Sequence, residues 1–206
     1  MANAQSLPHG GEHEATSTGL NHRKLLMWTF LGSDCMFFGT LIATYLVHQG
    51  NSVVGPFPED VFSIPITSVS TFVLLMSSMS MVLAYAALRR NNLKVFRIWL
   101  TSTAIMGMTF LAFQVFEFRD FAVHGLTPRT NLFGTTFFTL TGFHGAHVTL
   151  GVVWLLSLLF HSFRPGQVSA ERHLDVDLAA LYWHFVDIVW IVIFTVVYLF
   201  GVFEGF

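Results

Sequence analysis

Residues 133–160 read FGTTFFTLTGFHGAHVTLGVVWLLSLLF, an apolar run that contains no Asp, Glu, Lys or Arg and carries His144 and His147 near its centre. About 20 apolar residues are enough to cross the hydrocarbon core of a bilayer as a helix. Membrane β-strands are segments of about 10 residues with alternating polarity, so a run of this length indicates a helix. The stretch therefore predicts an all-helical integral membrane protein.

Four further apolar runs of similar length occur, at residues 25–47, 67–88, 98–118 and 179–203. Together with 133–160 they predict a bundle of five transmembrane helices in one domain, residues 25–206. We find no internal repeat and no soluble stretch long enough for a second domain. Residues 1–24 are polar and contain no apolar core of a signal peptide, so we expect a mobile tail.

The composition excludes several classes of protein. Only 11% of the 206 residues are charged, against about 25% in soluble domains, which argues against an ordinary soluble enzyme. The formal net charge is −2, so there is no basic excess for a nucleic-acid partner. The single cysteine, Cys35, cannot form an internal disulfide or a cysteine-based zinc site, and its apolar neighbours predict that it is buried.

The basic residues are distributed unequally between the two ends of the predicted bundle. Arg119 and Arg129 are expected at one end, and all other Lys and Arg at the end where the first helix begins. Cytoplasmic segments carry the excess of Lys and Arg, so we expect the N-terminus inside and the C-terminus outside. The larger group consists of Arg23, Lys24, Arg89, Arg90, Lys94, Arg97, Arg164 and Arg172.

Small and hydroxyl-bearing residues in two of the runs are typical of close contacts between membrane helices. We expect such contacts along the second and fourth helices. The residues are Ser77, Ser78 and Ser80 in the second run, and Thr141, Gly142, Gly145, Ala146 and Thr149 in the fourth.

Ionisable side chains inside the predicted helices are the candidate functional residues, because burying such a group in hydrocarbon is costly. Asp34 and Asp187 are each expected roughly 12–14 Å from the inner edge of the membrane, in one layer. His144 and His147 lie near mid-membrane, where contact with a carboxylate is feasible.

Helical spacing groups these residues further. His144 and His147 share a helix face, as His184 and Asp187 do, and Trp183 lies one turn before Asp187. The spacing predicts two polar stripes that face each other. Glu117 lies near the outer end of its helix, one turn after Gln114, where we expect interfacial water.

The residues alone leave several chemistries open. Interhelical hydrogen bonds that hold the five helices in place are favoured, and a buried carboxylate at Asp34 or Asp187 could instead relay protons. A stand-alone transporter that uses these two acids would be expected to show inverted repeats, and we find none. A metal site would draw on His144, His147, His184, Asp34 and Asp187.

A haem-binding membrane anchor is a further alternative. His147 and His161 are 14 residues apart on one helix, but the last helix offers no matching histidine pair. Phosphate-binding loops, nucleophile elbows and zinc-protease motifs do not occur in the sequence. Catalysis by this chain alone is therefore not predicted.

Two long motifs resemble subunit III of the haem–copper terminal oxidases. They are TLTGFHGAHVTLG at residues 139–151 and YWHFVDIVW at residues 182–190. Shorter segments, QVFEF at 114–118, FGTTFF at 133–138 and LGSDCMFF at 31–38, are similar to the same family. The resemblance covers about residues 25–201, nearly the whole chain.

The chain departs from the family pattern in three places. Five helices are expected where many members have seven, so it resembles the short bacterial type that lacks the first two. Asp34 stands where the family usually has a membrane-buried glutamate that reacts with carbodiimide. Residues 128–134, PRTNLFG, replace the family's Asp-Gly-x-Tyr-Gly turn.

The resemblance implies a subunit without haem or copper in the bacterial plasma membrane, beside the catalytic subunit I, which holds those cofactors, and with subunit II and a small subunit IV. Such a complex reduces oxygen and pumps protons, with cytochrome c as the expected electron donor and quinol as the alternative. Subunit III is expected to bind phospholipid in a cleft and to support proton uptake and stability during turnover. We expect no catalytic or metal-binding residue here, and lipid-cleft or structural roles for Asp34, Glu117, His144, His147, Trp183, His184 and Asp187.

Overall fold

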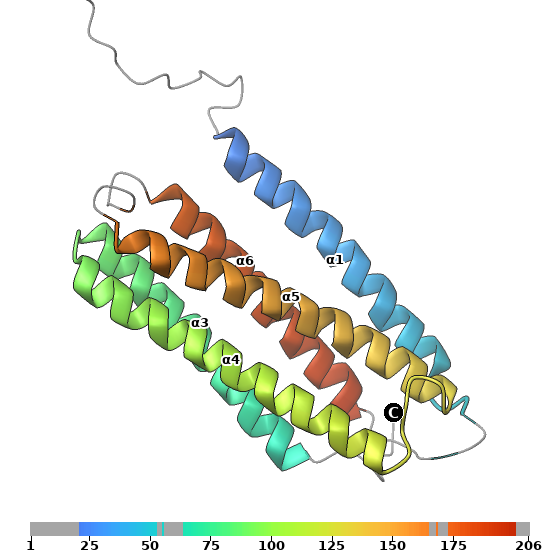
Figure 1. The fold of residues 1–206 in the computed structure, drawn as a ribbon. Coiled ribbons are helices and arrows are strands. Elements are labelled where there is room, and N and C mark those ends of the chain that lie inside the picture. The colour runs from blue at the N-terminus through green and yellow to red at the C-terminus, as the bar shows by residue number, and fades with distance from the viewer. Residues whose placement is uncertain (1–20, 53–54, 56–63, 165–167, 169–172, 201–206) are drawn as a thin grey trace, which may run out of the picture.

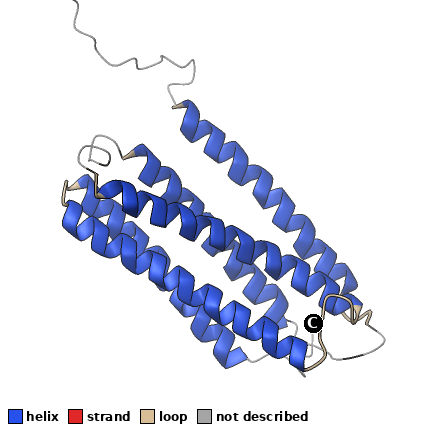
Figure 2. Cartoon of the chain, viewed as in Figure 1, coloured by secondary structure: helices blue, strands red, loops and turns tan. Residues whose placement is uncertain are grey.

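The computed structural model describes residues 21–52, 55, 64–164, 168 and 173–200. Its elements are α1 (His22–His48), α3 (Ile64–Arg89), α4 (Leu93–Val123), α5 (Leu132–Ser162), α6 (Leu174–Ile193) and a π-helical continuation of α6, η1 (Phe194–Leu199). The described residues contain no strand (Figure 2). Within these described ranges, five helices, with α6 and η1 counted as one, are long and apolar enough to cross a membrane. The predicted all-helical class with five spans is confirmed.

Helix ends extend beyond the predicted apolar runs because asparagine side chains cap them. Asn92 Oδ1 accepts a hydrogen bond from the backbone N–H of Val95 at 3.3 Å, so α4 begins five residues before its predicted run. Asn131 caps α5 in the same way, through the N–H of Gly134 at 2.7 Å. Hydropathy marks only the part in hydrocarbon, whereas backbone hydrogen bonding continues to the capping residue.

The predicted tail and the loops are only partly described. Residues 22–24, expected in the tail, are the first residues of α1. The rest of the tail up to residue 20, Arg172 and the predicted end of the last helix beyond residue 200 lie outside the described residues.

Four of the helices form the packed body of the protein, and α1 lies along one side of it (Figure 1). The main packing pairs are α3 with α4, α4 with α5, α5 with α6, and α3 with α6, whereas α1 packs mainly on α5 and α6. Within the most apolar stretch of each helix, 11% of α1 is buried, compared with 33–50% for the other four spans. α1 therefore has most of its surface turned away from the chain.

Charged side chains cluster at the end where α1, α4 and α6 begin and α3 and α5 end, which we call the basic end. The predicted grouping of Lys and Arg at one end is confirmed for the described residues. The side of the membrane on which the basic end lies stays a prediction. Four polar contacts join different segments at the basic end: Arg23 with Asp175 at 2.5 Å, Lys24 with Asp177 at 2.8 Å, Arg89 with His173 at 3.3 Å, and Arg97 with Ser162 at 3.2 Å.

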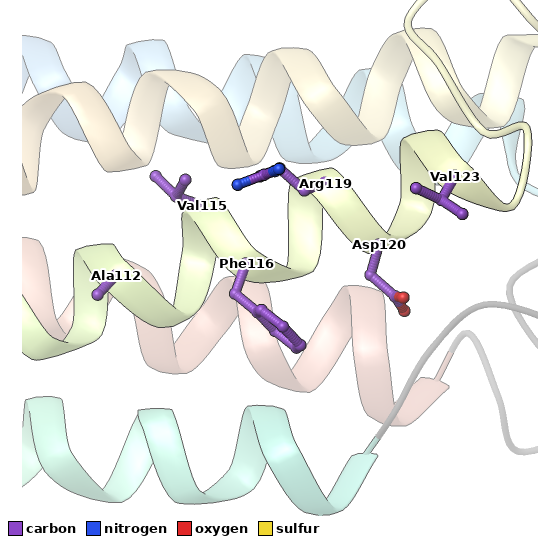
Figure 3. A pocket seen from close by; sticks show the side chains of 6 residues that line it. All are labelled: Ala112, Val115, Phe116, Arg119, Asp120 and Val123. Carbon is purple, nitrogen blue, oxygen red and sulfur yellow. The ribbon is translucent and has the colours of Figure 1, made fainter.

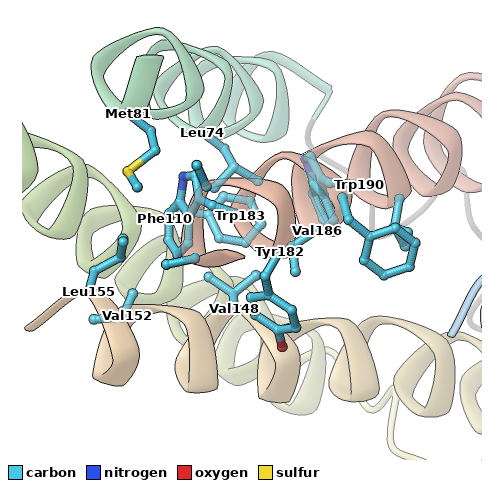
Figure 4. Packing of buried hydrophobic residues seen from close by; sticks show 14 of the residues in the cluster. Leu74, Met81, Phe110, Val148, Val152, Leu155, Tyr182, Trp183, Val186 and Trp190 are labelled. Carbon is cyan, nitrogen blue, oxygen red and sulfur yellow. The ribbon is translucent and has the colours of Figure 1, made fainter. Parts of the chain in front are cut away.

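Two tryptophans of α6 lie at the centre of the core, among side chains from α3, α4 and α5 (Figure 4). The ring of Trp183 fills a recess opposite Gly107 and Gly151. A Cβ atom at either glycine would lie 2.6 or 2.8 Å from that ring, which is closer than atoms can pack. The indole N–H of Trp183 donates to Ser77 Oγ at 2.9 Å. Trp183 thus fixes α6 against α4 and α5 through the two glycines, and against α3 through Ser77.

The predicted small-residue contacts are confirmed only in part. Ser80 Oγ donates to the Trp99 carbonyl at 3.0 Å, and Gly145 leaves room for Gln114, which donates to the Thr141 carbonyl at 2.7 Å. Three residues of α5 instead lie away from the described helices. A Cβ atom at Gly142 would have no neighbour within 4 Å, and Ala146 and Thr149 are exposed.

Cys35, predicted to be buried, is exposed on α1. An apolar run in a membrane helix shows that a residue lies in hydrocarbon, but it does not show whether the residue faces the bundle or the lipid.

Candidate functional site

The Asp34 carboxylate and the His147 imidazole meet where α1 packs on α5. Asp34 Oδ2 lies 3.6 Å from His147 Nε2, and their side chains are 13% and 15% exposed. His147 Nδ1 bonds to the Phe143 carbonyl at 2.8 Å, so Nδ1 must carry the hydrogen. A hydrogen bond between Nε2 and Asp34 would then need one further proton on either partner. A contact between a carboxylate and an imidazole, which the sequence left feasible at this depth, is present between Asp34 and His147.

Two aromatic residues support this contact. The Tyr182 hydroxyl donates to the backbone carbonyl of His147 at 3.0 Å, and its ring stacks on Phe30 of α1 at 6.4 Å. The ring of Phe38, also on α1, meets His147 edge-on at 5.0 Å. Sequence reasoning did not single out Tyr182. Its place in the 182–190 motif, directly before Trp183, was the only available signal.

Asp187 lies in a different place, against α3. The Ser78 hydroxyl is within hydrogen-bonding reach of the Asp187 carboxylate, and His184 Nδ1 lies 3.2 Å from Ser78 Oγ. The predicted stripe of His184 and Asp187 exists, but it meets α3 rather than the histidines of α5. The expected facing of the two polar stripes is therefore wrong, because equal depth in the membrane does not determine which neighbour a side chain faces.

His144 points into the core and not toward Asp34. Its side chain has no exposed surface; the ring stacks on Trp190 at 4.9 Å and meets Phe110 edge-on at 6.0 Å. Neither ring nitrogen has a hydrogen-bond partner among the described residues. Within that part of the chain, no group of three or more His, Cys, Asp or Glu side chains is arranged to hold a metal ion. The five residues of the metal alternative are thus not brought together.

Glu117 is buried, contrary to the expectation of interfacial water. Its carboxylate accepts hydrogen bonds from the Thr67 hydroxyl of α3 and, at 3.5 Å, from the Tyr198 hydroxyl of η1. α4 continues to Val123, and Phe121 in its last turn is also buried. Side chains of α3 and η1 therefore cover Glu117, which the hydropathy of its own helix does not show. Thr67 and Tyr198 were missed because a hydroxyl in an apolar run carries no distinctive pattern.

The three acids within the helices share one structural property. The carboxylate of each meets a helix other than its own: Asp34 on α1 meets α5, Asp187 on α6 meets α3, and Glu117 on α4 meets α3 and η1. Trp183, the remaining candidate, joins α6 to α3 through Ser77. Polar contacts of this kind stabilise the packing of membrane helices. The geometry favours a positioning role over a chemical reaction.

Comparison with known proteins gives consistent results over nearly the whole chain. Residues 5–202 match the family model described as cytochrome c oxidase subunit III. "Cytochrome c oxidase subunit 3" of Bacillus sp. (strain PS3) is 36% identical over 198 residues, which cover 96% of this chain and 95% of the relative. The protein of the same name from Alkalihalophilus pseudofirmus is 38% identical over 200 residues, with 97% and 96% covered.

A relative named as a quinol oxidase subunit has the same level of sequence identity over a slightly shorter stretch. "Probable quinol oxidase subunit 3" of Staphylococcus saprophyticus is 38% identical over 187 residues, which cover 90% of this chain and 92% of the relative. Sequence identity alone therefore does not decide whether the chain is more similar to cytochrome c oxidase subunits or to quinol oxidase subunits.

Proposed function

This chain belongs to the cytochrome c oxidase subunit III family, and from that premise we propose how it serves its complex. It is subunit III of a haem–copper terminal oxidase, a multi-pass membrane chain that is not itself catalytic in a complex that reduces oxygen. The proposal places it in the bacterial plasma membrane, beside the catalytic subunit I that carries haem and copper, together with subunit II and a small subunit IV. We also propose that the chain binds phospholipid.

We propose that Asp34 is a positioning residue for α1. The observation that carries this proposal is the Asp34–His147 contact, 3.6 Å long, at the middle of a helix that has few other contacts with the chain. By holding α1 and its neighbouring lipid in place, the contact keeps proton uptake by the catalytic subunit fast over many turnovers. A direct role in proton transfer would need a second acid beside Asp34. The buried acids Asp187 and Glu117 contact α3 and not α1, so Asp34 acts indirectly.

The Asp34 proposal is tested in the assembled, purified oxidase. Asp34→Asn keeps a polar group of the same shape, so the initial rate of oxygen consumption and the protons pumped per electron should not change. Asp34→Leu removes the polar contact and should shorten the active lifetime during turnover. Ser33→Ala, an exposed neighbour on α1, serves as the control. Loss of pumping in a fully assembled Asp34→Asn oxidase would contradict the proposal.

Cytochrome c is the proposed electron donor, and quinol is the alternative. The family model and two relatives carry the cytochrome c name, and a third relative of equal identity carries the quinol name. Oxygen consumption by the purified complex with ferrocytochrome c and, separately, with a quinol decides between them. Faster turnover with quinol would overturn the assignment of the donor without affecting the role of Asp34.

A further inference from the structure

His184 is a histidine near mid-membrane depth whose ring reaches the surface of the chain. The span formed by α6 and η1 is 26 residues long, and at 1.5 Å per residue His184 lies about 4 Å from its middle. The side chain is half-buried, and Nε2 makes no hydrogen bond with a described residue. Nε2 does not belong to the buried unpartnered atoms of that part of the chain, so it is accessible from outside.

Ser78 of α3 determines the orientation of this ring and the position of its hydrogen. The Ser78 hydroxyl is within hydrogen-bonding reach of the Asp187 carboxylate, and His184 Nδ1 lies 3.2 Å from Ser78 Oγ. The hydroxyl has a single hydrogen, and when Asp187 accepts it, the serine oxygen accepts the hydrogen of Nδ1. In a neutral ring whose Nδ1 carries the hydrogen, Nε2 is an acceptor. The chain therefore presents a hydrogen-bond acceptor on its surface near mid-membrane depth.

The other two histidines near this depth differ from His184. Nε2 of His147 faces the Asp34 carboxylate at 3.6 Å, so its partner lies within the chain. His144 has no exposed surface and is enclosed by aromatic rings. Of these three imidazoles, His184 alone directs to the outside a nitrogen that has no partner among the described residues.

Polar groups on another outward surface, along α4, lie at a different depth. The hollow there is lined by α4 alone (Figure 3). Its charged residues, Arg119 and Asp120, lie within about one turn of Val123, where the helix ends. Water and lipid headgroups supply hydrogen bonds near the end of a span, but not in its hydrocarbon middle. An acceptor at the depth of His184 therefore needs a donor from a protein.

Apolar side chains of two helices surround His184. Ile188 lies one turn after it on α6 and is 60% exposed. Leu75 and Val82 lie one turn before and one turn after Ser78 on α3, and they are 36% and 49% exposed. Acyl chains and a membrane helix can both cover such side chains, but acyl chains carry no hydrogen-bond donor. The acceptor at His184 therefore favours a helix.

We propose that His184 is a docking point for a transmembrane helix of another oxidase subunit, which donates a hydrogen bond to Nε2. The donor is a serine, threonine, tyrosine, tryptophan, asparagine or glutamine side chain, since these residues form hydrogen bonds between membrane helices. The apolar residues around His184 pack against the same helix. This inference rests on the proposed function only in that the chain is a subunit of an oxidase complex, and it is independent of the electron donor and of Asp34.

Two substitutions of His184 separate the docking contact from the contact with Ser78. In His184→Asn, the amide nitrogen takes the place of Nδ1 and no group remains at the position of Nε2. In His184→Gln, the amide oxygen takes the place of Nε2 as an acceptor. His184→Asn should weaken binding of this subunit to the complex about threefold, which corresponds to the average of about 0.6 kcal/mol for a hydrogen bond between membrane helices. His184→Gln should retain most of the binding.

Binding is measured as the fraction of this subunit that stays with the purified oxidase as the detergent concentration rises. His161→Asn is the matched control and should have no effect, because His161 Nδ1 bonds to the Ser157 carbonyl of its own helix. A histidine that only joins α6 to α3 would give the reverse order, with His184→Gln the weaker binder. The reverse order, or equal effects of the two substitutions, would overturn the proposal while leaving the chain an oxidase subunit.

A photoreactive side chain identifies what covers this surface. Ile188→benzoylphenylalanine, illuminated in the assembled oxidase and mapped by mass spectrometry, should cross-link to a transmembrane peptide of another subunit. Adducts with lipid alone, or with a second copy of this chain, would overturn the proposal. Failure of the chain to purify with an oxidase would instead overturn the proposed function, so the two failures are distinguishable.

Discussion

α6 and α1 are both long apolar helices, but the chain holds them very differently. Half of the most apolar stretch of α6 and η1 is buried, against 11% for α1. α6 is held by the fit of Trp183 into a glycine recess and by indole hydrogen bonds to α3. α1 is held by two ion pairs at the basic end, by Asp34 with His147, and by a few aromatic rings. The position of α6 is thus encoded within the chain, whereas α1 presents most of its surface to the membrane or to other subunits.

The largest predicted effect is at the glycine recess. In Gly151→Ala, the new Cβ would lie 2.8 Å from the rigid Trp183 ring, and overpacking of this kind costs about 1–3 kcal/mol. We expect a lower midpoint for thermal or denaturant-induced dissociation of this subunit from the oxidase. Gly142→Ala on the same helix is the matched control, because nothing lies within 4 Å of its Cβ. Equal stability of both variants would contradict the account of α6.

A moderate effect is predicted for Ser77→Ala. This change removes the acceptor of the Trp183 indole N–H, and hydrogen bonds between membrane helices average about 0.6 kcal/mol, with a maximum near 1.7. The same dissociation assay measures the loss, and tryptophan fluorescence reports the environment of the indole. Ser68→Ala, on the exposed side of α3, should change neither quantity. A Ser68 effect as large as that of Ser77 would show that the assay does not report the indole hydrogen bond.

A smaller effect is predicted for Asp175→Asn, which breaks the ion pair with Arg23. Both side chains are more than half exposed, so the pair is worth at most about 1 kcal/mol and is screened by salt. We expect faster cleavage or labelling near the start of α1 at low ionic strength, and no difference from wild type at high ionic strength. A difference that persists at high salt would contradict a purely electrostatic contribution.

The smallest effect is predicted for Gly39→Ala on α1, where a Cβ meets nothing within 4 Å in the chain. The isolated subunit should keep its stability or gain slightly, since alanine favours helix by up to about 1 kcal/mol. Loss of assembly with subunit I, without loss of stability of the isolated subunit, would sharpen the comparison by locating a partner helix on this side of α1.

Much of the fold could be predicted from the sequence, because hydropathy and basic residues report where a helix enters and leaves a membrane. The similar depth of Asp34 and the two α5 histidines left a contact between them feasible, and the structure shows it at His147. Depth does not give the direction in which a side chain points, so Asp187 was expected opposite the histidines and Cys35 was expected to be buried. Glu117 was expected at interfacial water because the hydropathy of α4 does not show that Thr67 of α3 and Tyr198 of η1 cover its carboxylate.

The central claim is that this chain is a haem-free subunit of a haem–copper oxidase. The direct test is a reduced-minus-oxidised visible spectrum of the affinity-purified chain in mild detergent, before and after its partners are dissociated. We predict an oxidase haem signal that appears together with a large partner and leaves with it. Haem that stays with this chain alone would contradict the claim. It would make His144, His147, His161 and His184 candidate ligands.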